Sequence, residues 1–119
     1  EMPWDNLALA VSKVIRCAPE GKRMGFADAF FSTQKNWVKS GDPIEEIKKV
    51  ARLGGLSADK VEACINDENI HNVVMTHRST GQEALGVKST PTIFVNNKKV
   101  EGAVGFDVVQ KVIEIELGQ

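Results

Sequence analysis

Apolar residues recur at intervals of three and four positions as far as the late eighties of the chain, which is the spacing of one helical face. Asp5 can cap the first predicted helix, and Pro19-Glu20-Gly21 ends it. Its apolar positions are Leu7, Val11, Val14, Ile15 and Ala18. A second helix carries a crowded aromatic set that we expect to form core rather than a ligand pocket. The apolar residues of this helix are Met24, Phe26, Ala27, Phe30, Phe31 and Trp37.

Three further helices are predicted before residue 86. Asp42, Pro43 and Glu45 form a capping-box-like start, and Gly54-Gly55 stops that helix. Ser57 can cap a short helix that runs through Cys64. The longer helix that follows has one apolar side, made by Ile70, Val73, Val74, His77, Ala84 and Leu85. We expect His77 to be a packed histidine with a local hydrogen bond, since no nucleophile or carboxylate motif lies beside it, and His71 to lie on the surface.

The pattern changes at Gly86. The β-branched and aromatic run Thr92-Ile93-Phe94-Val95 predicts a buried strand, and Asn96-Asn97 a tight turn. Lys98-Lys99-Val100-Glu101 is the expected returning strand, more exposed and therefore at an edge. A final amphipathic helix begins near Phe106. The predicted class is α+β and mostly helical, and because two strands make a poor sheet alone, we expect other strands upstream.

Composition narrows the possible functions. The 119 residues suffice for one modest core, and no apolar stretch is long enough to span a membrane. With 15 basic and 16 acidic residues, the formal charge of −1 gives no field that favours nucleic acid or an anionic surface. Glu1 is not a translation start, so we expect a chain that has been cut, processed or renumbered, without a signal peptide.

The two cysteines, Cys17 and Cys64, are far apart in sequence. There is no Cys-x-x-Cys, and no Cys/His cluster has the spacing of a zinc site, so we expect neither a metal nor another cofactor. A bond between the two would add roughly 4 kcal/mol of stability on the chain-entropy model. The alternative is two buried free thiols that act as small apolar residues, and spacing alone leaves both open.

The most specific local feature runs from Gly86 to Asn96, with the sequence GVKSTPTIFVN. A proline directly before a central strand needs explanation, because it cannot donate to the ladder. A cis Thr90–Pro91 bond would turn the chain sharply at that point. The simpler interpretation is that Pro91 only marks the entry to the strand.

This run resembles the cis-proline loop and following strand of thioredoxin-fold proteins, and the threonine before the proline is most similar to DsbA-type proteins. Further segments resemble the helical domain and the ending of DsbA-like proteins from alphaproteobacteria. They are Leu7-Ala8-Leu9-Ala10, Arg16-Cys17-Ala18-Pro19, Phe30 to Trp37, Glu62-Ala63-Cys64, Val100-Glu101-Gly102-Ala103 and the last helix. Asn97 departs from the family, in which glycine is common after the turn asparagine.

The resemblance implies a DsbA-type inserted helical domain over residues 1–87 and the ββα C-terminal half of a thioredoxin fold over residues 88–119. In that family a first βαβ unit carries Cys-x-x-Cys at a helix N-terminus, and this chain is expected to begin where that unit ends. No catalytic residue is therefore expected here. The resemblance assigns substrate binding to Ser89, Thr90, Pro91 and Thr92, and a structural disulfide in the helical domain to Cys17 and Cys64.

The function implied is that of a thiol:disulfide oxidoreductase, periplasmic or exported, that introduces or exchanges disulfides in exported proteins. Its expected partners are extended or unfolded cysteine-containing polypeptides and, for the intact protein, a membrane redox partner; nucleic acid and membrane insertion are not expected. This chain alone is expected to be inactive. Two alternatives stay open: a non-catalytic thioredoxin-like module that binds peptides, and a fragment of a kappa-class glutathione transferase-like protein. We also expect the hairpin and last helix to be mobile or to pair between chains.

Overall fold

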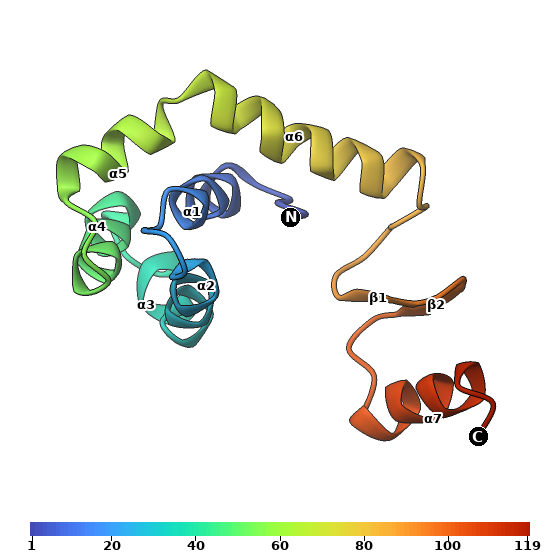
Figure 1. Ribbon diagram of the computed structural model, residues 1–119. Coiled ribbons are helices and arrows are strands. Elements are labelled where there is room, and N and C mark those ends of the chain that lie inside the picture. The colour runs from blue at the N-terminus through green and yellow to red at the C-terminus, as the bar shows by residue number, and fades with distance from the viewer. The chain divides into compact units, whose positions relative to one another are not determined.

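Two compact units, Glu1–Arg78 and Ser79–Gln119, make up the computed structural model, which describes residues 1–119 throughout. Figure 1 shows the order of the elements along the chain. The helices are α1 (Asn6–Arg16), α2 (Arg23–Ser32), α3 (Gln34–Val38), α4 (Pro43–Leu53), α5 (Ala58–Ile65), α6 (Glu68–Glu83) and α7 (Phe106–Glu116); the strands are β1 (Thr92–Val95) and β2 (Lys98–Glu101). The division falls within α6, whereas the predicted domain boundary lies after residue 87. No helix combines the length and apolar character needed to cross a membrane.

Local capping signals place the helices of the first unit. The side chains of Asp5, Asp42 and Ser57 accept hydrogen bonds from backbone N–H groups three residues later, at 2.7, 3.2 and 3.3 Å. All three caps were predicted from the sequence, and they are confirmed. Asp67 caps α6 in the same way, accepting from the Ile70 N–H at 2.9 Å. Each cap satisfies one of the backbone donors that the first helical turn leaves without a partner.

One continuous core joins α1 to α5. The α1 helix packs against α2, α4 and α5, and α4 packs against α2, α3 and α5. The buried members of the cluster are Val11, Val14, Phe26, Phe30, Trp37, Ile47, Ala51, Leu56 and Val61. Trp37 completes its burial by donating from Nε1 to the Phe30 carbonyl oxygen at 3.0 Å, so its one polar group is not left unpaired.

The aromatic segment differs from its prediction in two ways. The helix expected to run on to Trp37 is interrupted at Thr33, whose hydroxyl donates to the Ala29 carbonyl oxygen at 2.7 Å and so competes with the helical ladder. Core burial is confirmed for Phe26, Phe30 and Trp37, but it is wrong for Met24 and Phe31, each 74% exposed. The α2 helix has apolar residues on both faces, and only one face meets α1, α3 and α4.

The second unit holds an antiparallel hairpin followed by α7. Strand β1 pairs with β2 in the register Thr92↔Glu101 to Val95↔Lys98, and Asn96 takes the positive φ of 53° that the tight turn requires. The predicted hairpin is confirmed. The prediction that β1 is buried is wrong, because Ile93 and Phe94 are both exposed. The α7 helix packs against β1, but none of its own residues is buried. Apolar side chains of both elements therefore remain exposed to solvent.

Gly54 offers a test of core packing in the first unit. It ends α4 at φ −88°, which any residue can adopt, but a Cβ at this position would overlap the buried Phe26 ring. We expect Gly54→Ala to lower the free energy of unfolding by about 1–3 kcal/mol through overpacking. Chemical denaturation monitored by circular dichroism measures this. The control is Gly25→Ala, inside α2 with no atom within 4 Å of the new Cβ, which we expect to stabilise by about 0.5–1 kcal/mol. Equal effects of the two substitutions would contradict this account.

Candidate functional site

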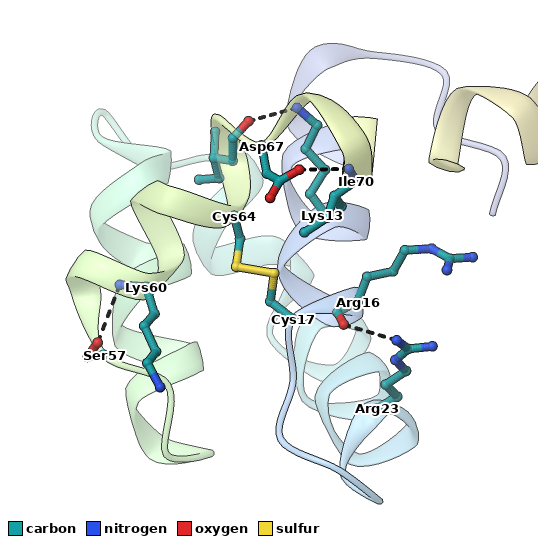
Figure 2. Close-up of a disulfide and its surroundings, with 10 residues drawn as sticks. Lys13, Arg16, Cys17, Arg23, Ser57, Lys60, Cys64, Asp67 and Ile70 are labelled. Atoms are coloured by element: carbon teal, nitrogen blue, oxygen red, sulfur yellow. Dashed lines mark hydrogen bonds between the residues drawn. A yellow bond between two sulfur atoms is a disulfide. The ribbon is translucent and has the colours of Figure 1, made fainter. Parts of the chain in front are cut away.

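Cys17 and Cys64 form a disulfide that joins the end of α1 to α5 (Figure 2). Their Cα atoms lie 6.4 Å apart, although the residues are separated by 47 positions in sequence. The packing of α1 against α5 brings them together. Cys64 is buried and Cys17 is half-buried, at the edge of the core of the first unit. The bond therefore links the first helix of that core to the fifth.

Both sulfur atoms belong to residues near helix C-termini. Cys17 is the C-terminal cap of α1, and Cys64 is the second-last residue of α5. The partial negative charge of a helix C-terminus disfavours a thiolate, whereas reactive cysteines gain acidity from a helix N-terminus or nearby cations. Lys13 and Arg16 lie in the last turn of α1 and balance that dipole. The helix positions alone thus favour the bonded form over two acidic thiols.

Lys13 is a buried charge beside this disulfide that sequence reasoning missed. It is 8% exposed, and its Nζ donates to the Ile65 carbonyl oxygen at 2.7 Å (Figure 2). That carbonyl closes α5, so the ammonium meets both a hydrogen-bond acceptor and the negative end of a helix dipole. The signal was present in the spacing, because Lys13 lies three residues after Ala10 and four before Cys17 on the buried side of α1.

A second polar cluster surrounds the Glu1 carboxylate. Arg16 donates to it from Nε and Nη2 at 2.5 and 2.9 Å, and His77 Nδ1 lies 3.0 Å from the same group. Burial alone would raise the pKa of the Glu1 carboxyl, but the Arg16 hydrogen bond and the nearby charges lower it below its usual value. The prediction that His77 is a packed histidine is wrong. Its side chain is 51% exposed, and it faces this carboxylate.

Contacts within the second unit hold the segment that leads into the predicted substrate loop. Gly86 has φ +63°, a conformation that favours glycine, and Val87 donates to the Gly81 carbonyl oxygen at 2.8 Å from a buried position. Lys99 of β2 donates from Nζ to the Gly86 carbonyl oxygen at 3.1 Å. These contacts tie the start of the loop to α6 and to the hairpin. The clamp between Gly86 and Lys99 was not anticipated from sequence.

The loop itself exposes a short stretch of backbone. The Thr90–Pro91 peptide bond is cis, and Ser89, Thr90 and Pro91 are all exposed. Thr92 donates its hydroxyl to the Ser89 carbonyl oxygen at 2.6 Å, and the Pro91 carbonyl oxygen accepts from the Gly102 N–H at 2.9 Å. The internal hydrogen bonds of the loop use neither the N–H nor the C=O of Thr90. Thr90 thus presents a free donor and a free acceptor directly before β1.

The predicted residues form two sets. Ser89 to Thr92 lie together in the second unit, and the two cysteines lie together in the first. The expectation that this chain lacks the cysteines of a thiol–disulfide protein needs correction, because Cys17 and Cys64 form a disulfide, the pair to which the resemblance assigned a structural role. The pair escapes a search for Cys-x-x-Cys spacing, since helix packing and not sequence proximity creates it. No group of three or more His, Cys, Asp or Glu side chains is placed to hold a metal ion.

Comparison with known proteins adds an independent finding. A family model described as "Thioredoxin" matches residues 2–115. Two proteins named "Putative protein-disulfide oxidoreductase" also match. The one from Rickettsia bellii is 26% identical over 94 residues, which are 78% of this chain and 36% of that protein. The one from Rickettsia typhi is 25% identical over 76 residues, which are 64% of this chain and 28% of that protein. The chain thus spans about a third of the length of these curated relatives. No solved structure matches it.

Proposed function

The chain belongs to the thioredoxin family, and from this premise we propose that it is the substrate-binding part of a DsbA-like thiol:disulfide oxidoreductase. The fold is thioredoxin-like and mostly helical. In the proposed arrangement, the helices of the first unit are the inserted domain, and β1, β2 and α7 are the C-terminal ββα half of the thioredoxin fold. The names of the two relatives support an activity on protein disulfides.

The observation that carries the proposal is the exposed, unpaired backbone of Thr90 beside a proline. Pro91 has no N–H, and its carbonyl oxygen is already bonded to Gly102, so Thr90 is the free hydrogen-bonding position of the loop. An extended polypeptide can pair with such a position as an added strand. Backbone pairing depends little on side chains, which suits an oxidoreductase that acts on many unfolded proteins.

The chemistry assigned to the complete oxidoreductase is thiol–disulfide exchange. A substrate thiolate attacks one sulfur of a disulfide and displaces the other as a thiolate, which leaves a mixed disulfide that a second thiolate resolves. The role of this chain is to hold the substrate backbone extended near its reacting cysteine. The substrates proposed are unfolded cysteine-containing proteins in an exported or periplasmic setting, and a membrane redox partner would restore the oxidised state.

For the Cys17–Cys64 pair we propose a structural role in this scheme. Both cysteines lie at helix C-termini, where a thiolate is disfavoured, and the bond closes a long loop around the core of the first unit. A reacting pair would need an acidic, accessible thiol. Cys64 is buried and therefore lacks the accessibility that such a thiol needs.

Peptide binding by the whole chain tests the proposal. The probe is a short unstructured peptide with one S-methylated cysteine, which cannot undergo thiol exchange. We expect its addition to shift the amide NMR signals of Ser89, Thr90 and Thr92. Pro91→Ala should weaken binding by about tenfold, or ~1.4 kcal/mol, because it restores an N–H and removes the fixed φ of the residue next to Thr90.

The matched control is Pro43→Ala, which replaces the first residue of α4 in the other unit and should leave binding unchanged. Unperturbed signals from Ser89 to Thr92 at saturating peptide would refute the proposal. Equal weakening by both proline substitutions would show that the effect of Pro91→Ala comes from a general loss of stability.

A further inference from the structure

One face of the hairpin holds the substrate loop, which runs from Gly86 to Thr92. Side chains alternate between the two faces of a strand. Thr92 of β1 is paired with Glu101 of β2, so Lys99 lies on the same face as Thr92. The Thr92 hydroxyl donates to the Ser89 carbonyl oxygen at 2.6 Å. From the neighbouring strand, Lys99 Nζ donates to the Gly86 carbonyl oxygen at 3.1 Å.

Lys99 is the one side chain from outside the loop that donates to it. At the far end of the loop, the Pro91 carbonyl oxygen accepts from the backbone N–H of Gly102 at 2.9 Å. Next to Gly86, the Val87 N–H donates to the Gly81 carbonyl oxygen at 2.8 Å. These two contacts join backbone to backbone and do not depend on the side chains present. The Lys99 contact can therefore be removed by a substitution that leaves the loop sequence unaltered.

An ion pair restricts the Lys99 ammonium to the side of β2 on which it meets the loop. Its Nζ lies 3.2 Å from Glu101 Oε1, and the Lys99 side chain is 34% exposed. Ion pairs that are open to solvent stabilise a fold by little. The consequence of this pair is orientation, because the carboxylate lies on the same strand and face as the lysine and holds the ammonium there.

We propose that Lys99 is a positioning residue for substrate peptides, because its bond to Gly86 keeps the loop in the conformation in which Thr90 offers its N–H and C=O. The inference rests on the proposed function, which assigns peptide binding to Thr90, and adds a residue outside the loop that sets the affinity. When only a fraction of the molecules has the binding-competent conformation, the apparent affinity falls by that fraction. Loss of the Lys99 bond lowers this fraction.

The test compares binding of the S-methylated peptide, chosen without net charge, by the whole chain and by Lys99→Met. We expect the dissociation constant to rise about fivefold, which is within the range by which one hydrogen bond shifts an equilibrium. In the free variant, NMR relaxation should show greater mobility of the backbone from Val87 to Thr90. Lys99→Arg retains a charged donor and should restore binding to within about twofold of the unaltered chain.

The matched control is Lys98→Met, which removes the same charge from the same strand. Lys98 lies on the other face of β2 and makes no hydrogen bond or ion pair, so binding should be unchanged. Should Lys99→Met fail to fold, Lys99→Thr replaces it, because threonine favours a strand and is too short to reach Gly86.

The outcomes separate this inference from the function on which it rests. Absence of peptide binding by the unaltered chain would refute the proposed function itself. Binding that Lys99→Met leaves intact would overturn only the role of Lys99, and so would an equal loss in Lys98→Met, which would assign the effect to charge. Loop mobility that Lys99→Met does not change would also overturn it, because a positioning residue must act on the free loop.

Discussion

Replacement of Phe30 by alanine should lower the free energy of unfolding of the Glu1–Arg78 unit by about 3–5 kcal/mol. Phe30 is 1% exposed and lies at the centre of the aromatic cluster, with ring centroids 6.5 Å from both Phe26 and Trp37. The Trp37 contact is edge-to-face, with an interplanar angle of 77°. Pairs of this kind stabilise a fold by about 0.5–1.5 kcal/mol, in addition to the free energy gained from the apolar area that they bury. The Phe30 ring therefore stabilises the unit by more than the free energy of its transfer out of water.

The neighbouring residue provides the control for this prediction. Phe31 has the same side chain and the same helix but is 74% exposed, so Phe31→Ala should change stability by no more than about 0.5 kcal/mol. Urea denaturation monitored by the fluorescence of the two tryptophans, Trp4 and Trp37, measures both variants. Because small domains have only about 5–15 kcal/mol of stability, Phe30→Ala should remove a large fraction of the stability of this unit. A loss below that of Phe31→Ala would show that the helix faces are assigned wrongly.

Local signals were the part of the fold that the sequence revealed best. Asp5, Asp42 and Ser57 act within one helical turn, so their caps do not depend on the rest of the molecule. The hairpin was equally accessible, because two asparagines at a tight turn fix the register of the strands they join. In each case the residues that determine the structure are neighbours in sequence.

Burial was harder to predict, because it depends on which partners reach each face. Phe30 and Phe31 are equally apolar and adjacent, yet only one meets the other helices. Ile93 and Phe94 belong to a strand whose composition is typical of a buried one, but β2 and α7 leave both side chains exposed. Composition can identify a surface that requires cover, and only the tertiary structure shows whether the chain supplies it.

The candidate site likewise has one part that could be predicted from local sequence and another that depends on tertiary contacts. The Thr90–Pro91 loop could be located from sequence, since a proline before a strand restricts the backbone on its own. The Gly86–Lys99 clamp that holds the loop could not, because it joins a residue ahead of β1 to a residue of β2, 13 positions later in the sequence. The spacing of Lys13 placed it on the buried side of α1, but its partner could not be predicted, because the Ile65 carbonyl oxygen that meets its charge is identified only in three dimensions.

Removal of the Cys17–Cys64 bond should cost roughly 4 kcal/mol in the free energy of unfolding, on the chain-entropy model for a loop of this length. The bond restricts the unfolded chain between α1 and α5, so its loss favours the unfolded state. Two independent routes should give the same loss: the double replacement Cys17→Ala with Cys64→Ala, and reduction of the unaltered chain. Urea denaturation of each against the oxidised protein measures it.

The same variants separate a structural bond from a redox-active one. If the bond is structural, the double variant should still bind the S-methylated peptide at Ser89 to Thr92 under conditions in which it remains folded. The bond should also resist reduction by glutathione, because neither thiol gains acidity from its helix end. Insulin reduction by this chain that disappears in the double variant, with folding retained, would assign the chemistry to this pair. A stability loss well under 1 kcal/mol would independently remove the structural interpretation, since the loop entropy predicts several times that value.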